Sequence, residues 1–243
     1  MNSLLLFDVD GTIAHSGKKI EQLIGDKLSI LNKKFDLGIV GGGKLEKVLY
    51  QLDGCKFKHY FTECGCVYDK NIDGKLKTIY VKNIRDHELY PKINLLIKEA
   101  LGFLSKVDYM LSGNFIDLRN GIIYISLIGM VATEEERRYF IELNKKEDYI
   151  TKLLKKLKDK ALEMDVLSKL SICRGGEVGI AIYPAEYDKV QVLDSLLEEY
   201  NDIHYFGDKF DTDGNDYKLL NDGRIIGHKV TSVEDTLEIL NKI

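Results

Sequence analysis

Two aspartates follow directly on a short apolar run near the start of this 243-residue chain. Leu4 to Phe7 predict a buried strand, and Asp8-Val9-Asp10-Gly11-Thr12 comes next. Residues two apart on an extended segment point the same way, so the carboxylates of Asp8 and Asp10 are predicted to converge on one substrate atom. We therefore expect a site at the carboxyl edge of a parallel sheet. The alternative is a strand that ends in an ordinary Asp-Gly turn.

The composition excludes several classes of function. Apolar residues make up 44% of the chain, enough for real cores, and the net charge is only -4 with both signs mixed. No basic stripe favours nucleic acid, and no polybasic run favours a membrane surface. We find neither a signal peptide nor an apolar stretch that could span a bilayer. We expect a cytoplasmic protein whose four cysteines are free thiols.

Strands and helices alternate at both ends of the chain but not in its middle. Residues 1–82 and 185–243 predict one discontinuous α/β domain with a doubly wound, mostly parallel core sheet. Residues 83–184 predict an inserted α+β domain, in which an antiparallel sheet packs with helices. Such a layout commonly forms an active site between the two domains.

Short local signals support this division. Asp73-Gly74 and Asn120-Gly121 each predict a β-hairpin. Thr133 followed by Glu136 predicts a helix that opens with a capping box. Residues 188–200 predict one continuous helix, and a strand over 203–208 follows it.

A second acidic cluster follows that late strand. Asp208 comes directly after it, and Asn215 and Asp216 follow a few residues later. In a parallel sheet these residues lie at the same edge as Asp8. Three carboxylates with a backbone carbonyl suit Mg²⁺, so we predict Asp8, Asp208 and Asp10 as ligands, the last through its carbonyl. The other explanation is an ordinary polar turn.

These groups suit phosphoryl transfer. We assign Asp8 as the nucleophile and Asp10 as the general acid and base. Crowding of the two carboxylates is expected to raise the pKa of one of them. Lys189, at the start of the preceding helix, would neutralise phosphate charge, although a solvated surface lysine is the ordinary alternative. Asn215 and Asp216 would orient the lysine and metal-bound waters.

The whole chain resembles the haloacid dehalogenase (HAD) superfamily and, within it, the eukaryotic phosphomannomutases. The motifs that carry the resemblance are Asp8 to Thr12, Ile39-Val40-Gly41-Gly42, Phe115 to Gly121, Ile128-Gly129, Glu134 to Arg137, Tyr205 to Lys209, Gly214-Asn215-Asp216 and Val230 to Thr236. The superfamily motifs alone would not distinguish this family from its relatives. Together with the others they are specific for it.

The resemblance implies interconversion of mannose 6-phosphate and mannose 1-phosphate, the precursor of GDP-mannose. It further implies a phospho-aspartate at Asp8, a hexose 1,6-bisphosphate intermediate and activator, and Mg²⁺. Arg119 and Arg137 of the inserted domain would bind the second phosphate, to which arginine is well suited. Asp222, with Leu220, would belong to a second metal site. Related enzymes pair through this domain, so a homodimer is expected.

The chain departs from the family at substrate positions. Small or apolar residues stand where the family has polar ones: Gly17, Gly43, Met130, Gly179 and Ala181. Lys18, Lys19, Arg138 and Arg174 are candidates for compensation. The alternative functions are a Mg²⁺-dependent phosphatase for sugar phosphates or other small phosphomonoesters, and a non-catalytic binding relative. The intact Asp8, Asp10, Lys189 and Asp208 argue against the non-catalytic relative.

Overall fold

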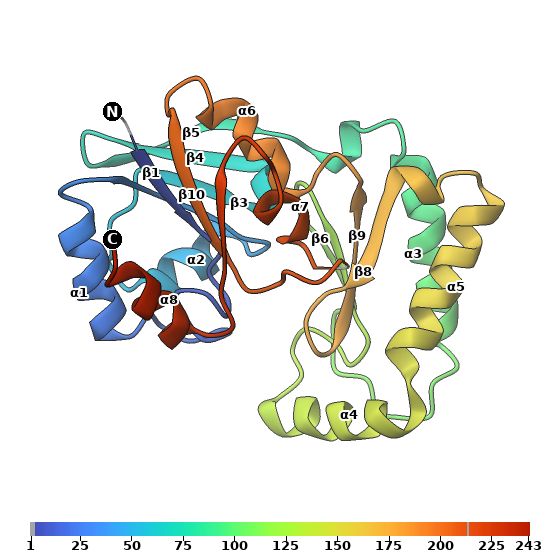
Figure 1. Cartoon of the computed structure of the whole chain (residues 1–243). Helices are drawn as coiled ribbons and strands as arrows, with labels where there is room; N and C mark the ends of the chain where they lie inside the picture. The colour runs from blue at the N-terminus through green and yellow to red at the C-terminus, as the bar shows by residue number, and fades with distance from the viewer. Residues whose placement is uncertain (1–2, 213) are drawn as a thin grey trace. The chain divides into compact units, whose positions relative to one another are not determined.

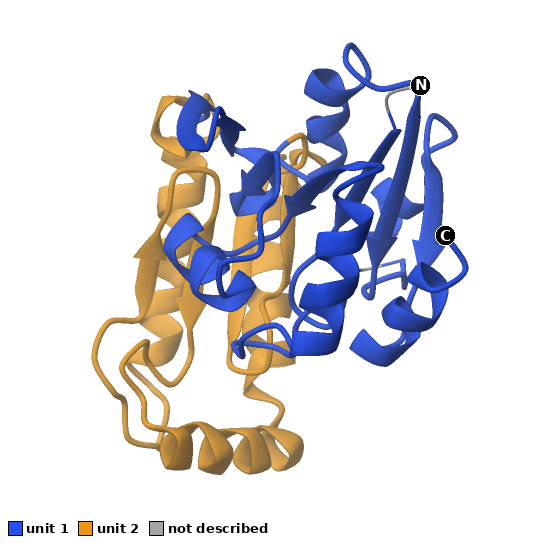
Figure 2. Cartoon of the chain, turned by 90° about the vertical axis from the view of Figure 1, so that its left-hand side faces the viewer, with its two compact units in different colours: residues 1–82, 187–243 blue, residues 83–186 orange. Residues whose placement is uncertain are grey.

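The computed structural model describes residues 3–212 and 214–243. Its internal contacts divide the chain into two compact units, shown in Figure 2: unit 1 contains residues 1–82 and 187–243, and unit 2 contains residues 83–186. The second division falls two residues later than the sequence analysis placed it. His87 Nε2 lies 2.7 Å from Glu186 Oε1, which holds the end of this segment within unit 2.

Unit 1 is built on a seven-stranded sheet in the order β11-β10-β1-β2-β3-β4-β5. The first five of these strands run parallel, and β4 and β5 add an antiparallel edge. The strand bounds are β1 Ser3–Phe7, β2 Asp36–Val40, β3 His59–Thr62, β4 Val67–Ile72, β5 Lys75–Val81, β10 Asp202–Gly207 and β11 Ile226–Lys229. The sheet is therefore mostly parallel, as predicted.

Both faces of this sheet are covered, because β1 is apolar on both sides. Leu5 and Phe7 pack in one core with helices α1, α2 and α8, while Leu4 and Leu6 pack in a second core with η4, α6 and α7 (Figure 1). The helix bounds are α1 Gln22–Leu31, α2 Leu45–Leu52, η4 Lys189–Val192, α6 Leu193–Leu196, α7 Tyr217–Leu220 and α8 Val233–Leu240, and the short 3-10 helix η1 spans Glu63–Gly65. Side chains on a strand alternate between faces, so a run of four apolar residues supplies two layers.

Unit 2 has a four-stranded antiparallel sheet in the order β6-β7-β9-β8. Its strands are β6 Ile116–Leu118, β7 Ile123–Ser126, β8 Leu170–Arg174 and β9 Gly179–Pro184. Its helices are α3 Tyr90–Leu104, α4 Glu134–Glu147 and α5 Tyr149–Glu163, with 3-10 helices η2 Ile84–Asp86 and η3 Leu167–Lys169. This is the α+β arrangement that the sequence predicted.

Most local predictions are confirmed, and two fail for identifiable reasons. Asp73 and Gly74 adopt φ of 51° and 81° in the β4–β5 turn, and Thr133 and Glu136 form the capping box of α4. The single helix predicted over 188–200 is wrong: the segment is a 3-10 turn followed by one short helix. Strand β11 was missed because it has only four residues and lies at the sheet edge, where its side chains are mostly exposed.

A buried histidine links the sheet of unit 1 to the segment after α6. His59 Nδ1 lies 2.8 Å from Tyr68 Oη, and its Nε2 lies 2.7 Å from Tyr200 Oη, which in turn donates to Asp36 Oδ2 at 2.6 Å. We assign the Nε2–H tautomer, because the Tyr200 hydroxyl already gives its proton to Asp36. Burial lowers the pKa of His59 to about 4, so the folded state prefers the neutral ring.

We predict that this histidine makes unit 1 sensitive to mild acid. The unfolded ring titrates near pH 6.5 and the folded ring near 4, so stability is lost as pH falls between these values. At about 1.4 kcal/mol per pH unit, wild type loses about 2 kcal/mol between pH 7 and 5 from this residue alone. Urea unfolding at both pH values measures the loss.

The variant for this test is His59→Gln, which keeps hydrogen-bonding groups but does not titrate. We expect its stability to fall by about 2 kcal/mol less than that of wild type over the same interval. His15→Gln, which removes an exposed histidine, serves as the matched control. Equal losses in His59→Gln and wild type would contradict the assignment.

Candidate active site

A buried ion network lies at the carboxyl edge of the unit 1 sheet. Lys189 Nζ donates to Asp8 Oδ1 at 2.5 Å and to Asp216 Oδ1 at 2.6 Å. The Tyr205 hydroxyl donates to Asp216 Oδ1 at 2.5 Å, and the Lys209 backbone N–H donates to Asp216 Oδ2 at 2.9 Å. The three charged side chains of the network are at most 9% exposed. Residues 8, 189 and 216 therefore meet at one point.

Local structure explains why these residues meet. Asp8 follows the central strand β1, and its backbone N–H donates to the carbonyl of Phe206 on the neighbouring strand β10 at 2.9 Å. Lys189 is the first residue of η4, whose N-cap Asp188 accepts a hydrogen bond from the Val190 N–H at 3.0 Å. The cap fixes where the turn begins, and so which residue points toward the sheet edge.

The contacts within this network shift the pKa values of Asp8, Asp216 and Lys189. Burial raises the pKa of Asp8 to about 7; Asp216 and Asp208 add to this rise, and Lys189 opposes it. Burial also acts on Asp216 and Lys189, but their mutual attraction more than offsets it. The pKa of Asp216 is therefore lowered and that of Lys189 is raised. Lys189 and Asp216 form a fixed ion pair, and Asp8 is the group with a variable proton.

The residues around Asp8 fit a divalent cation. Carboxylate oxygens of Asp8, Asp208 and Asp216 lie within 4.8 Å of one another. Asp208 Oδ1 is buried without a hydrogen-bond partner among the described residues, while its other oxygen pairs with Lys209. Gly11 has a φ of 91°, and a Cβ there would lie 2.5 Å from Asp208 Oδ2, so glycine lets the loop approach the carboxylate. An all-oxygen donor set with an unsatisfied carboxylate oxygen suits Mg²⁺.

The side chain of Asp10 has different partners from that of Asp8. Its Oδ2 accepts from Lys47 Nζ at 2.5 Å, and its Oδ1 accepts from Gln51 Nε2 at 2.8 Å and from the Gly17 N–H at 3.1 Å. Burial would raise the pKa of Asp10, but these donors more than offset it and lower the pKa. The expectation that mutual crowding raises one pKa is therefore corrected: burial with Asp216 and Asp208 raises that of Asp8.

Several residues around the site were not found by the sequence analysis. Lys47 and Gln51 are four residues apart on α2, which places them on one helix face, and Gln51 is a buried polar residue. That spacing is a signal that sequence reading could have used. Gln191 is buried two residues after Lys189; its Nε2 donates to the Cys64 carbonyl at 2.8 Å, and its Oε1 accepts from Lys82 Nζ at 2.8 Å. These contacts hold η4 against the turn that follows β3.

Two predicted residues lie apart from this network. Asn215 is half-buried in the turn that precedes α7. Asp222 accepts two hydrogen bonds from the Arg224 guanidinium, at 2.8 and 2.7 Å, so its carboxylate is already engaged. The proposed second metal site at Asp222 and Leu220 stays a prediction.

In unit 2, Arg119 and Arg137 lie near one tyrosine. The Arg119 guanidinium carbon is 5.4 Å from the Tyr124 ring centre, and its Nε donates to Asp117 Oδ2 at 2.8 Å. Burial raises the pKa of Tyr124, and the charges of Arg137 and Arg119 oppose that rise. Arg119 thus lies against the Tyr124 ring, and the charge of Arg137 acts on the same phenol; we call this part of unit 2 the Tyr124 patch.

This tyrosine accounts for one of the departures from the family. A Cβ at Gly179 would overlap the Tyr124 hydroxyl, and one at Gly175 would lie 2.7 Å from the ring. Tyr124 also pairs with Ala181 across strands β7 and β9. The large side chain therefore fills space that opens where the neighbouring strand carries small residues.

Gly17, another position at which the chain departs from the family, has a separate explanation. Gly17 adopts a left-handed φ of 71°, which a side chain would strain. Its N–H binds Asp10 instead. The adjacent Lys19 pairs with Asp53 at 2.6 Å, as an ordinary exposed ion pair does.

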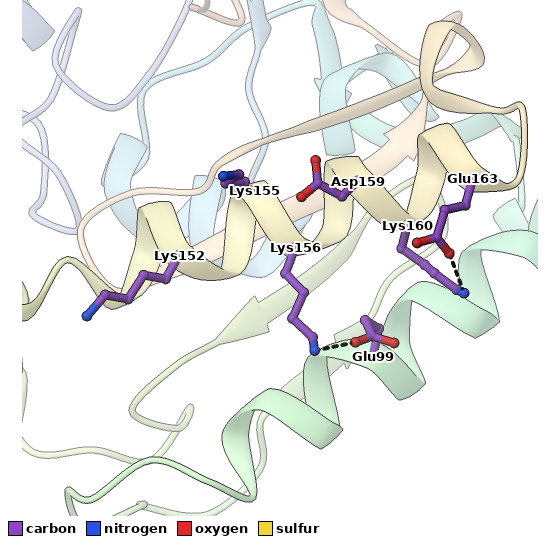
Figure 3. A pocket seen from close by; sticks show the side chains of 7 residues that line it. All are labelled: Glu99, Lys152, Lys155, Lys156, Asp159, Lys160 and Glu163. Carbon is purple, nitrogen blue, oxygen red and sulfur yellow. Dashed lines mark hydrogen bonds and ion pairs between the residues drawn. The ribbon is translucent and has the colours of Figure 1, made fainter.

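A groove lined by charged side chains lies on unit 2, between α3 and α5. It has a volume of 410 Å³ and is lined by Glu99 of α3 and by charged residues of α5 (Figure 3). Lys156 pairs with Glu99 at 2.7 Å, and Lys160 pairs with Glu163 at 2.8 Å. Lys156 and Lys160, two of the four lysines that line the groove, are therefore paired with carboxylates.

Solved structures with the same fold include proteins titled as a nucleotidase and as a phosphatase. The ATP-bound IMP-nucleotidase of Plasmodium falciparum superposes with a TM-score of 0.71 at 16% identity, over 99% of this chain and 59% of that one. The trehalose-6-phosphate phosphatase C-terminal domain of C. albicans gives 0.61 at 15% identity, over 99% and 92%. At such low identities the likeness shows the fold alone, a HAD-type core with an inserted domain.

Sequence comparison is more specific. Phosphomannomutase 1 of Homo sapiens is 35% identical in an alignment 248 positions long. The alignment covers 99% of this chain and 91% of that protein. The phosphomannomutases of Arabidopsis thaliana and Saccharomyces cerevisiae are each 33% identical over at least 96% of the chain and more than nine-tenths of their own length. The family described as eukaryotic phosphomannomutase matches residues 24–243. The chain belongs to the eukaryotic phosphomannomutase family.

Proposed function

We propose that the protein is a phosphomannomutase, which interconverts mannose 6-phosphate and mannose 1-phosphate. The observation that carries the proposal is the buried contact of Lys189 with Asp8, at the edge of the sheet and beside an unsatisfied Asp208 oxygen. The full-length similarity to phosphomannomutases supports the choice of substrate.

In this mechanism Asp8 is the nucleophile. Its carboxylate oxygen attacks phosphorus of a hexose 1,6-bisphosphate, the P–O bond to the sugar breaks, and a phospho-aspartate and a hexose monophosphate result. Transfer of that phosphoryl group to the other hydroxyl of a sugar phosphate completes the isomerisation. Lys189 neutralises charge on the group in transfer. A magnesium ion held by Asp8, Asp208 and the Asp10 carbonyl would supply further electrostatic stabilisation.

Asp10 is the proposed proton carrier. It takes the proton of the sugar hydroxyl that attacks the phospho-aspartate, and it returns that proton to the sugar oxygen that leaves phosphorus when Asp8 is phosphorylated again. In the structure its carboxylate is bound to Lys47, Gln51 and the Gly17 N–H. These donors keep it ionised and ready to act as a base, and it must release one of them to meet the sugar oxygen.

Unit 2 is proposed to bind the distal phosphate through Arg119 and Arg137. A mutase must hold a second phosphate in either orientation of the sugar, which two guanidinium groups allow. Tyr124 offers a hydroxyl at Gly179 and Ala181, two of the positions where the family has polar residues. We propose that it replaces part of their contribution to sugar binding.

We further propose a cytoplasmic homodimer that pairs through unit 2. Met110, Val131 and Tyr139 of this unit are 85%, 66% and 60% exposed, and pairing of two copies through unit 2 would cover such side chains. Within the described residues, the helices are all too short or too polar to cross a membrane.

The second candidate function is hydrolysis of small phosphomonoesters. It is favoured by the glycines and apolar residues at substrate positions, because each lost charge-assisted hydrogen bond costs about 1.5–3 kcal/mol of binding. A weaker hold on the sugar would let water attack the phospho-aspartate. Both functions use Asp8, so the products decide between them.

Phosphorus NMR distinguishes the two functions. With Mg²⁺, mannose 1-phosphate and a trace of glucose 1,6-bisphosphate, we expect mannose 6-phosphate to form. Asp8→Asn should lower the rate at least about 1,000-fold, because the nucleophile is lost. Asp73→Asn is the matched control: it makes the same chemical change in an exposed turn and should leave the rate unchanged.

The other outcomes of this experiment are equally definite. Inorganic phosphate as the sole product, abolished by Asp8→Asn, would replace the mutase with the phosphatase. Turnover that survives Asp8→Asn would rule out the phospho-aspartate in both.

The Tyr124 hydroxyl is tested by Tyr124→Phe, which keeps the ring over Arg119. If the hydroxyl binds substrate, KM for mannose 1-phosphate should rise about 10-fold or more, while fold stability is kept. Tyr139→Phe, on the exposed side of α4, is the control. A KM equal to that of wild type would show that Tyr124 only fills space.

A further inference from the structure

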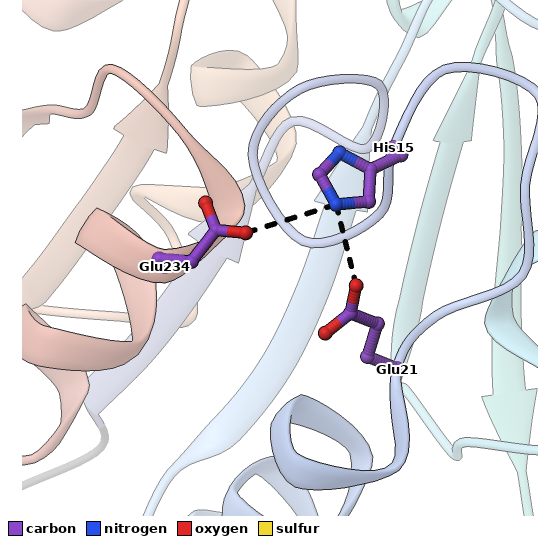
Figure 4. Close-up of side chains that lie close together, drawn as sticks. All are labelled: His15, Glu21 and Glu234. Atoms are coloured by element: carbon purple, nitrogen blue, oxygen red, sulfur yellow. Dashed lines mark ion pairs between the residues drawn. The ribbon is translucent and has the colours of Figure 1, made fainter.

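Three side chains outside the active site converge on one point of unit 1. His15 lies in the loop between β1 and α1, Glu21 is the N-cap residue of α1, and Glu234 lies in the first turn of α8. Figure 4 shows both carboxylates directed at the same imidazole nitrogen, Nε2. One donor atom from each residue lies within 4.8 Å of the other two. All three side chains reach solvent, so an ion could enter freely.

The separations within this cluster are those of ligands around a small ion. His15 Nε2 is 3.3 Å from Glu21 Oε1 and 3.8 Å from Glu234 Oε1. A charge-assisted N–H···O bond would be shorter, about 2.7–2.9 Å. Ligands about 2.0–2.2 Å from a tetrahedral zinc ion are separated by about 3.3–3.6 Å. The first distance matches that spacing, and the second needs only a small movement of an exposed glutamate.

The donor types select the kind of metal. Imidazole nitrogen is a ligand of zinc and its transition-metal neighbours, whereas Mg²⁺ prefers oxygen alone. We propose that His15, Glu21 and Glu234 form a zinc site, with water completing the coordination. This site differs from the all-carboxylate group of Asp8, Asp208 and Asp216, which suits Mg²⁺.

An ion here would fasten a functionally important loop. The loop from Asp8 to Glu21 carries both proposed catalytic aspartates, and the Gly17 N–H binds Asp10. Zinc would tie this loop through His15 to the N-terminal ends of α1 and α8. Because zinc would bind the folded chain and not the unfolded one, it should raise the melting temperature of unit 1.

The test is a zinc titration of the full chain by calorimetry, in a large excess of Mg²⁺ that fills the carboxylate site. Wild type should bind zinc and gain in Tm. His15→Ala should abolish this binding. Glu234→Gln should weaken it at least about tenfold, because loss of a direct ligand should cost no less than loss of an outer hydrogen-bond partner, about 10–100-fold. Glu46→Gln, which alters an exposed glutamate in the first turn of α2, should bind as wild type does.

A parallel titration of Asp208→Asn separates the two metal sites, because zinc binding at His15 should persist in it. Failure of wild type to bind zinc would overturn the proposal and would show that His15 and its neighbours form only an exposed ion pair. Survival of the binding in His15→Ala, or its loss in Asp208→Asn, would also overturn it. None of these outcomes affects the proposed mutase reaction, since the readout is binding and not turnover.

Discussion

The rest of the structure depends on a buried cation, the ammonium group of Lys189. An unpaired charge inside a protein is strongly destabilising, so the chain must supply anions at the same point. Asp8 and Asp216 do so from positions 181 and 27 residues away in sequence. This requirement fixes how β1, η4 and the loop before α7 close around the sheet edge. The active site and the stability of unit 1 are thus built from the same contacts.

The same network leaves a deficit of positive charge. Three carboxylates, those of Asp8, Asp208 and Asp216, lie close together. Lys189 pairs with Asp8 and Asp216, and Lys209 pairs with one oxygen of Asp208. Burial and the neighbouring carboxylates raise the pKa of Asp8 to about 7, which means that its ionised form is costly in the protein alone. A dication would remove that cost and keep the nucleophile ionised. The raised pKa of Asp8, the orphaned Asp208 oxygen and the close approach of Gly11 are therefore consistent with the divalent cation that this donor set suits.

The sequence predicted the fold well where local and global signals agree. The apolar run before Asp8, the Asp73-Gly74 turn and the Thr133 capping box each specify their own structure, and each is confirmed. The sequence predicted the partners of Asp10 poorly. The expectation that Asp8 and Asp10 point the same way holds only while the chain is an extended strand. Strand β1 ends at Phe7, before either aspartate, so the two side chains are free to take different partners. Lys47 and Gln51 are then brought to Asp10 by the packing of α2, which no local pattern near residue 10 encodes.

The two units are under different constraints, and three of the five departures from the family, Met130, Gly179 and Ala181, lie in unit 2. In unit 1, Lys189, Asp8 and Asp216 depend on one another, so replacing one leaves buried charge unpaired and the others must stay. In unit 2, Arg119 donates to Asp117 and lies over the Tyr124 ring, and both contacts are separate from the buried ion network of unit 1. A Cβ at position 179 would lie 2.4 Å from the Tyr124 hydroxyl and 2.5 Å from the Ile125 carbonyl oxygen, so a serine there would require its neighbours to move. Glycine at position 179 beside Tyr124 therefore keeps the sheet packed, while it changes which polar groups of the sheet are available to bind a sugar. Substrate preference can drift by this route without loss of the phosphoryl-transfer machinery.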